Sequence, residues 1–246
     1  MIIRPQVTNE NEFGLSTELS QMAQQKSIAT GMFEYMDDFV TEVDSGVDSY
    51  IVTALTSGEV SHGAEHGGVI VVDSGAATDN QGVGSAQLDS NGVVKVASGK
   101  NIYCEMRVNR LVQSGGQFWG LAAVDTTVMT ATHFGAIGVG FVCDAGSSAI
   151  TALDVITTNS GTANTTETVT ADVLTGMASD DKYRTYGIHI IGNGEVRYYI
   201  DRVLVATHTT SANIPTSALV PTFTSVNSAA TQSKLEVDYI YIAADR

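Results

Sequence analysis

The sequence predicts an all-β protein, an antiparallel β-sandwich, and the clearest evidence lies between residues 182 and 242. Apolar and polar residues alternate over 195–200, which is the period of a half-buried strand. A Gly-Asn-Gly turn at 192–194 precedes this run, and its residues tolerate the positive φ of a tight hairpin loop. A second reversal is expected at Asp201-Arg202. Together these features predict three consecutive antiparallel strands.

Length and composition agree with this class. A chain of 246 residues can bury a large core, and an all-β sandwich of this size is commonly one domain. The net charge of −15 repels phosphate backbones and anionic lipid, so we expect no direct nucleic-acid partner. No apolar run reaches the roughly 18–20 residues of a membrane span, and residues 1–14 lack a signal-peptide apolar core. We therefore expect neither membrane insertion nor classical export.

The N-terminal residues differ from the rest of the chain. Apolar side chains between Asn11 and Val40 recur at spacings near three and four, which predicts one helix or two short ones after an extended arm. We divide the chain into an arm and helix (1–36) and a sandwich (37–246). The helix either covers one end of the sandwich or docks on a neighbouring subunit. The side chains expected to bind a partner are Phe13, Leu15, Leu19, Met22, Met32 and Phe33.

From Asp37 onward, short β segments alternate with turn signals such as Asn91-Gly92. The run TTNSGTANTTE (157–167) is predicted to be an exposed polar loop. Cys104 and Cys143 each share a face with apolar residues and are expected to be buried thiols without a disulfide. The expected strands are 50–55, 68–73, 86–88, 93–96, 101–112, 118–124, 136–143, 149–156, 166–173, 183–191, 195–200, 203–209, 222–226 and 235–242.

The chain contains FEYMDDF, HGGVIVVDSGAATDN, NIYCEMRVNRL and FWGLAAVD in its first half, then KYRTYGIHI, VRYYIDRVLVATHT, IP…LVPTFTSVN and LEVDYIYIA. These segments resemble the concanavalin A-like lectin/glucanase superfamily in its laminin-G-like form. The resemblance covers roughly residues 37–246 and implies a jelly roll. It departs at the hairpin, where Asp201-Arg202 replaces the family's common Asp-Gly.

The second departure concerns catalysis. Glucanases of the superfamily carry a Glu-x-Asp-x-x-Glu run on one strand, and retaining hydrolysis needs two carboxyl groups about 5–5.5 Å apart. This sequence offers Glu105 alone on one strand, and Glu236 with Asp238 on another. We therefore expect no catalytic residues.

Metal sites are also disfavoured, and no cofactor is expected. His62 and His66 stand in the order His-Gly-Ala-Glu-His rather than His-Glu-x-x-His, and the following glycines favour a loop. Trp119 is expected in the core or between subunits. Tyr183, Tyr198, Tyr199, Tyr239 and Tyr241 are expected to pack across strands. Calcium could bind acidic loop residues, but solvated turn carboxylates are the favoured interpretation for Asp73, Asp79, Asp125 and Asp144.

The acidic, Ser/Thr/Gly/Ala/Val-rich composition after a helical arm also resembles virion proteins of tailed bacteriophages. The leading hypothesis is a non-enzymatic capsid decoration (cement) protein, assembled in the host cytoplasm and located in the virion. Its expected partners are the major capsid protein and copies of itself, with a trimer suggested by the resemblance. One alternative is a carbohydrate-binding module of a tail fibre or cell-surface protein, with a glycan as partner. Another is a glycoside hydrolase with an unrecognised site.

Overall fold

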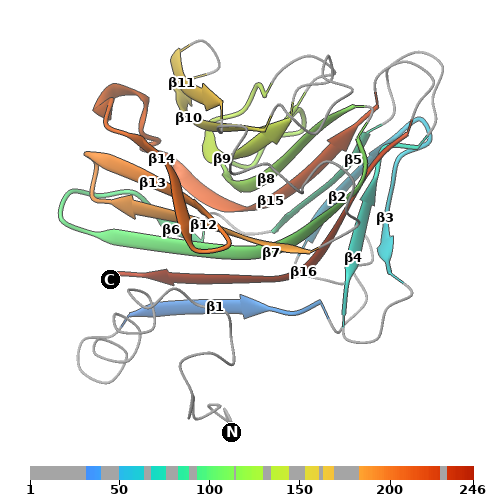
Figure 1. Cartoon of the computed structure of the whole chain (residues 1–246), viewed down its shortest axis with the longest axis horizontal. Helices are drawn as coiled ribbons and strands as arrows, with labels where there is room; N and C mark the ends of the chain where they lie inside the picture. The colour runs from blue at the N-terminus through green and yellow to red at the C-terminus, as the bar shows by residue number, and fades with distance from the viewer. Residues whose placement is uncertain are drawn as a thin grey trace, which may run out of the picture.

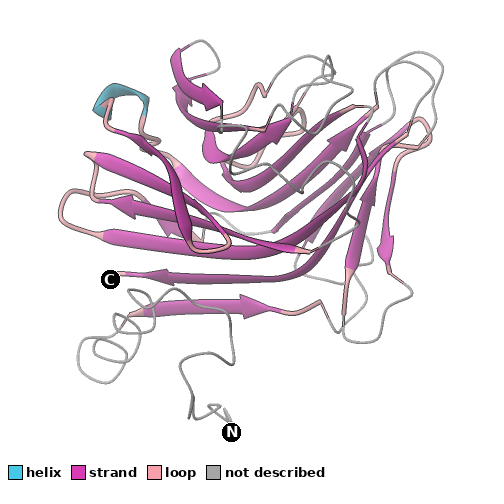
Figure 2. Cartoon of the chain, in the orientation of Figure 1, coloured by secondary structure: helices cyan, strands magenta, loops and turns pink. Residues whose placement is uncertain are grey.

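The computed structural model confirms the all-β prediction. Two antiparallel sheets stack face to face as a sandwich (Figures 1 and 2). Within the described part of the chain, the single helical element is the 3₁₀ turn η1 (Ser211–Asn213), and no helix there is long and apolar enough to cross a membrane. The structure describes residues 32–39, 50–63, 68–75, 83–88, 93–113, 115–129, 134–143, 153–160, 163–168, 183–227 and 232–246.

The first sheet, called sheet A, has eight strands in the order β14-β13-β12-β7-β16-β4-β3, and β1 also pairs with β16. Figure 1 shows the blue strand β1 beside the dark red strand β16. The strands of sheet A are β1 (Phe33–Asp37), β3 (Glu59–His62), β4 (Ile70–Asp73), β7 (Asn101–Gln113), β12 (Arg184–Ile191), β13 (Glu195–Ile200), β14 (Val203–His208) and β16 (Ser233–Ala244).

The second sheet, called sheet B, also has eight strands, in the order β11-β10-β9-β8-β15-β5-β2, and β6 pairs with β15. All pairings among its described strands are antiparallel. The strands of sheet B are β2 (Tyr50–Leu55), β5 (Val83–Leu88), β6 (Val94–Lys95), β8 (Gly116–Ala122), β9 (Gly138–Cys143), β10 (Asp154–Ser160), β11 (Ala163–Thr168) and β15 (Ala218–Val226).

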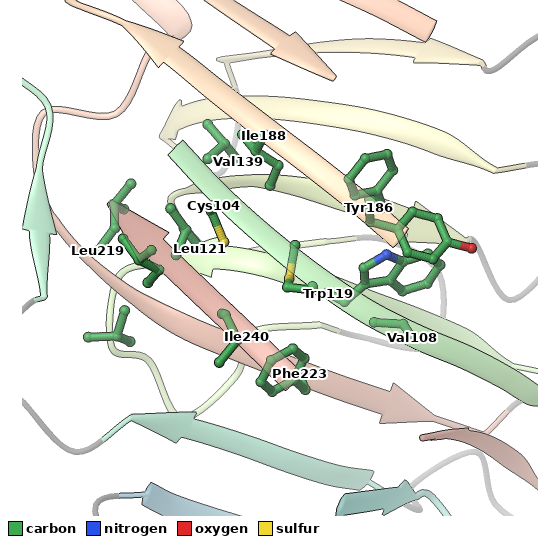
Figure 3. Close-up of a cluster of buried hydrophobic side chains, with 14 of the residues drawn as sticks. Cys104, Val108, Trp119, Leu121, Val139, Tyr186, Ile188, Leu219, Phe223 and Ile240 are labelled. Atoms are coloured by element: carbon green, nitrogen blue, oxygen red, sulfur yellow. The ribbon is translucent and has the colours of Figure 1, made fainter. Parts of the chain in front are cut away.

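The core lies between the sheets and is built from alternate residues of each strand. Aromatic rings join the two layers, with the Trp119 and Tyr186 ring centroids 5.0 Å apart in a T-shaped arrangement (Figure 3). Trp119 is fully buried, as is Cys104, which confirms their assignment to the core. Cys143 is buried as well, and no disulfide joins the two cysteines.

Both predicted hairpins are confirmed. β12 pairs with β13 across the Gly-Asn-Gly turn, and β13 pairs with β14 across Asp201-Arg202. Asp201 and Arg202 both have positive φ, 47° and 70°, which is the backbone of a type I′ turn. The Asp201 carboxylate offsets part of this strain because it accepts the Thr185 N–H at 3.0 Å and pairs with Arg184.

Replacing Arg202 with glycine should therefore stabilise the protein. The left-handed conformation costs a non-glycine residue roughly 1–2 kcal/mol, and glycine avoids this cost. Glycine also makes the unfolded chain more flexible, which offsets part of the gain, so we expect a net stabilisation of about 0.5–1 kcal/mol. Thermal and urea unfolding measure it. A variant less stable than the wild type would show that the arginine side chain contributes more than the turn strain costs.

The helical prediction is wrong for its last residues. Residues 33–37 form strand β1, which adds to sheet A beside β16. Alternate residues of β1 are half-buried and exposed, and such a short segment fits a strand as well as one turn of helix. Strand β1 also spans residues 36 and 37, between which we expected the arm to end and the sandwich to begin. The remainder of the expected arm, residues 1–31, lies outside the described residues.

The polar run at 157–167 is not the loop that its composition predicted. Most of it belongs to β10 and β11, which pair as a hairpin. Thr157 and Thr158 are both buried, and the Thr157 hydroxyl, on the inner face, finds partners across the sandwich. Strand β3 was not predicted either; its Glu59–His62 segment is short and follows a glycine.

One corner of the sandwich brings the two sheets into backbone contact. A Cβ atom built on Gly84 in β5 would lie 2.2 Å from the Asp73 carbonyl oxygen in β4 and 2.8 Å from that of Glu59 in β3. Stacked sheets normally lie about 10 Å apart. The close approach is possible because Gly84 has no side chain.

Candidate functional site

The outward face of sheet A is polar and aromatic, and strand register arranges its residues in rows. Residues that alternate with the core positions of each strand point to this face. Its central row runs across six strands, with neighbours paired at each step. From β1 to β14, the row is Met36, Tyr241, Glu105, Gly187, Tyr199 and Leu204.

Glu105 lies at the centre of this row and is almost completely enclosed. Its side chain is buried (1% exposed) although it points away from the core. The Tyr103 hydroxyl donates to Oε2 at 2.9 Å, and the Tyr239 hydroxyl donates to Oε1 at 2.9 Å. A Cβ on neighbouring Gly187 would lie 3.1 Å from the Tyr103 hydroxyl oxygen, so the glycine leaves room for that hydroxyl. We call Tyr103, Glu105 and Tyr239 the Glu105 cluster.

The enclosure changes the acidity of this carboxyl group. Burial raises the pKa of Glu105 from its ordinary value of 4.5 to about 7, and the two tyrosine hydrogen bonds and the charge of Arg202 offset only part of this increase. Glu105 is therefore about half protonated at neutral pH. Burial also raises the pKa of Tyr239 above its ordinary range, as does the neighbouring charge of Glu105.

Next to the Glu105 cluster lies a charged network. Arg107 forms an ion pair with Asp238, and its guanidinium carbon lies 4.7 Å from the centre of the Tyr183 ring. The Tyr183 hydroxyl donates to Glu236 at 2.9 Å, and the Asn109 amide donates to the same oxygen at 3.2 Å. Each carboxylate on this part of the face thus has a named partner.

This arrangement does not meet the requirements of a two-carboxylate glycosidase. Glu236 pairs with Asn109, four residues from Glu105 along β7, which places it roughly 13 Å away at about 3.3 Å per residue. Asp238 is bound by Arg107, and both oxygens of Glu105 accept tyrosine hydroxyls. The site can hold a proton near neutral pH, but the described side chains leave no open pair of carboxyl groups around it.

The outward face of sheet B is closed by apolar side chains. Phe118 stacks on Phe134 with ring centroids 4.2 Å apart, in a second buried cluster that also contains Val128 and Met129. Polar residues on this face bond to one another, as Ser85 does to Thr224 at 2.8 Å. The described strands therefore present no open polar site on this side.

The six residues predicted to bind a partner fall into two groups along the chain. Phe13, Leu15, Leu19 and Met22 lie outside the described residues. Met32 packs against the buried pair Tyr103 and Ala243, as Tyr241 does, and Phe33 packs against the main core. Both are half-buried on their own chain, Met32 at the edge of the outward face of sheet A and Phe33 on the inner face.

The metal candidates are dispersed. His62 lies in β3, Asp73 pairs with Lys234 at 3.5 Å, and Asp125 accepts the Thr127 N–H at 2.9 Å in its own turn. Among the described residues, no group of three or more His, Cys, Asp and Glu side chains is placed to hold a metal ion. The other candidates lie outside the described residues; they are His66, Asp79 and Asp144.

A buried polar group between the sheets was not anticipated from the sequence. The Thr157 hydroxyl lies 2.6 Å from the Tyr198 hydroxyl and 2.7 Å from His208 Nδ1. The Tyr198 hydroxyl also donates to the Ile156 carbonyl at 2.6 Å. Burial lowers the pKa of His208 to about 4, so it is neutral at physiological pH. These bonds link β10 in sheet B to β13 and β14 in sheet A, which indicates a structural role.

Replacing Tyr239 with phenylalanine should raise the pKa of Glu105 above about 7. The hydroxyl stabilises the ionised carboxylate, so its loss favours the protonated form. NMR titration of the Glu105 side-chain carboxyl carbon measures the change. Tyr199→Phe serves as the control because no hydrogen bond from Tyr199 to Glu105 contributes to this pKa. An unchanged or lower pKa in the Tyr239 variant would contradict the hydrogen-bond assignment.

Comparison with known proteins now defines the class. No protein-family model and no curated protein matches the sequence. Among solved structures, Bacillus licheniformis beta-glucanase matches with a TM-score of 0.59 and 13% identity, over 85% of this chain and 97% of that one. The Emp47p carbohydrate recognition domain matches at 0.52 and 11%, over 85% and 94%. The binding domain of botulinum neurotoxin DC matches at 0.50 and 13%, over 78% of this chain but only 43% of that one.

The chain therefore has the concanavalin A-like jelly-roll fold, which glucanases, lectin domains and toxin binding domains share. At these identities the likeness establishes the fold alone, since one fold hosts many functions. None of these three neighbours is named as a virion protein.

Proposed function

We propose that this chain is a non-catalytic binding and assembly domain. The observation that carries the proposal is the enclosure of Glu105, whose pKa burial raises to about 7, by two tyrosine hydroxyls. A general acid must reach the proton acceptor on its substrate within hydrogen-bond distance. A carboxyl group with 1% exposure and both oxygens occupied cannot do so without rearrangement.

Hydrolysis assays test the absence of catalysis. The full chain, incubated with a panel of β-glucans and other polysaccharides, should release no more reducing ends than a buffer control. The Glu105→Gln variant should behave identically. Hydrolysis by the wild type that disappears in this variant would overturn the proposal.

The setting that we propose is the virion of a tailed bacteriophage, where the chain binds the major capsid protein as a decoration protein. The sequence resemblance supports this setting, as do the apolar side chains exposed on edge strands, Met36, Ile51 and Leu204. Cryo-electron microscopy and mass spectrometry of purified particles test it. The chain should occupy the capsid surface in many copies, and its absence from particles or its restriction to the tail tip would overturn the assignment.

Glycan binding is the second candidate, because the outward face of sheet A carries several half-buried tyrosines. Tyr183, Tyr199, Tyr239 and Tyr241 lie there beside charged groups, and aromatic rings with adjacent polar groups suit sugar recognition. A glycan array with the wild type and Tyr199→Ala tests it. Binding that Tyr199→Ala abolishes supports this candidate, and the lack of any bound glycan removes it.

A further inference from the structure

Strand β1 is a short edge strand of sheet A. It contains five residues, and among the described strands it pairs only with β16, at residues 240–244. Its inward side chains Phe33 and Tyr35 pack against the main core, and the Tyr35 hydroxyl lies 3.2 Å from the Tyr50 hydroxyl of sheet B. A short strand that is held on one side only opens at a lower free energy than the central strands of a sheet.

The residue that precedes β1 covers part of the Glu105 cluster. Met32 is half-buried and packs against the buried pair Tyr103 and Ala243 on the outward face of sheet A. Tyr103 is only 6% exposed, and its hydroxyl donates to Glu105 Oε2 at 2.9 Å. When β1 separates from β16, Met32 leaves Tyr103, and water gains access to the tyrosine and to the carboxyl group that it binds. The docking of β1 and the hydration of Glu105 are therefore linked.

The charges near Glu105 act in the same direction. Burial raises the pKa of Tyr241 above its ordinary range, and the charges of Glu34 and Glu105 both add to this increase. Glu34 belongs to β1, so an ionised Glu105 adds a second negative charge near Tyr241 while β1 is docked. The titratable and charged groups around Glu105 are Tyr103 and Arg107 in β7, Tyr239, Tyr241 and Asp238 in β16, His189 in β12, Tyr199 in β13, Arg202 in the turn after β13, and Glu34 in β1.

The direction of the link follows from burial. Burial raises the pKa of Glu105 to about 7 while β1 is docked, whereas the pKa of a hydrated carboxyl group returns toward its ordinary value of 4.5. The docked state therefore binds the proton more tightly than the open state. Below pH 4.5 Glu105 is protonated in both states. Between pH 4.5 and 8 the open state loses the proton first, so opening becomes more favourable as pH rises.

We propose that ionisation of Glu105 releases strand β1 from β16. While the carboxyl group is protonated, β1 and Met32 stay docked on sheet A. Loss of the proton favours the open strand, which frees the backbone of β16 at residues 240–244. The inference rests on the proposed function, because Met32 and Phe33 belong to the side chains predicted to bind a partner, and release of β1 makes them available to it.

Hydrogen exchange measured by mass spectrometry on the full chain tests this release. The wild type and Glu105→Gln are compared at the same pH, so the intrinsic exchange rate cancels, as does any contribution of His189. At pH 8 the amides of residues 33–37 should exchange about 10-fold or more faster in the wild type, with a limit of about 300-fold if opening lowers the pKa of Glu105 from about 7 to 4.5. At pH 4.5 the two proteins should exchange nearly alike.

The dependence of exchange on urea separates local release from global unfolding. Exchange of β1 should hardly change with urea below the unfolding transition, because a local opening exposes little surface. Exchange of β13, a strand inside sheet A, should rise steeply with urea because it requires global unfolding. If β1 and β13 responded to urea alike, the pH effect would be global and the inference would be wrong.

The reciprocal experiment measures the pKa of Glu105 by NMR titration of its carboxyl carbon. Met32→Ala uncovers Tyr103 and should lower this pKa from about 7 toward 4.5. Met36→Ala is the matched control, because it removes the same type of side chain from β1, but Met36 is 52% exposed and does not belong to the cluster of Met32. The control should leave the pKa near 7. Thermal unfolding of both variants confirms that they are folded, and an equal pKa in the two would overturn the link.

The outcomes separate this inference from the proposed function. Equal exchange of β1 in the wild type and Glu105→Gln at pH 8 overturns the inference, even if the chain decorates capsids. A strand β1 that opens as Glu105 ionises, in a chain that is absent from particles, supports the inference and overturns the virion setting. Hydrolysis of a polysaccharide would overturn the proposed function and leave the exchange of β1 as the measure of the inference.

Discussion

Replacing Gly84 with alanine should lower the free energy of unfolding by about 2–3 kcal/mol. The added methyl group would lie 2.2 Å from the Asp73 carbonyl oxygen, a distance that real Cβ atoms do not show. Because the neighbouring atoms are backbone of β4 and β3, they can move only if sheet A shifts away from sheet B. A clash with backbone falls at the upper end of the roughly 1–3 kcal/mol that overpacking costs, and the lower flexibility of the unfolded alanine chain offsets about 0.4–1 kcal/mol of it, which leaves a net loss slightly above about 2 kcal/mol.

Thermal unfolding measures the effect, with an expected decrease in Tm of about 5–10 °C. Gly194→Ala is the matched control, because a Cβ there meets nothing within 4 Å. The control should change stability by less than about 0.5 kcal/mol. If both variants unfolded at the wild-type temperature, the close contact between the sheets at this corner would be wrong.

Replacing Glu105 with glutamine should remove a pH dependence of stability between pH 4.5 and 8. The pKa of Glu105 is about 7 in the folded protein, above its ordinary value of 4.5. The folded state therefore binds more protons than the unfolded state in this range, and stability falls as pH rises through 7. Glutamine cannot ionise, so the variant should be more stable than the wild type at pH 8, by on the order of 2 kcal/mol.

Urea unfolding across this pH range gives the comparison. Near pH 4.5 the two proteins should be nearly equally stable, because Glu105 is then protonated. Burial lowers the pKa of His208 from its ordinary value of 6.5 to about 4, so this residue destabilises the folded protein as pH falls below 6.5. Both proteins contain His208, so the difference between their stabilities reports on Glu105 alone. The surface variant Glu59→Gln should keep the wild-type profile. If the free energy of unfolding of Glu105→Gln changed with pH as that of the wild type does, the Glu105 carboxyl group would be solvated rather than buried.

Much of the fold follows from local patterns in the chain. The hairpins at 192–194 and 201–202 were predictable because turn chemistry and two-residue alternation agree there. The alternation around Cys104 also assigns Tyr103, Glu105 and Arg107 to the face opposite the core. Glu105 was noted from the sequence only as a carboxylate without partners for hydrolysis.

The rest depended on information that is not local. Tyr239 reaches Glu105 because a register shift between Val237 and Tyr239 re-aims the strand, and an irregularity of this kind has no clear sequence signal here. Thr157 was assigned to a loop because its neighbours are polar, yet its hydroxyl is satisfied by residues 41 and 51 positions away. The apolar spacing that predicted a helix through Met36 was outweighed by pairing with β16.

The position of β16 in sheet A has a consequence for how the protein is made. This strand lies between β7 on one side and β4 and β1 on the other, yet it follows all the other described strands along the sequence. Until the ribosome has released residues 233–244, β1 and β4 cannot join β7 in one sheet. Until then the edges of β1, β4 and β7 that pair with β16 remain unpaired in the nascent chain. The pairing of β1 with β16 joins Phe33 to Ala244, which are far apart in the sequence. Pairing at such separations is slow, so sheet A should be among the last parts of the fold to close, with the unfinished sheet exposed to aggregation in the interval.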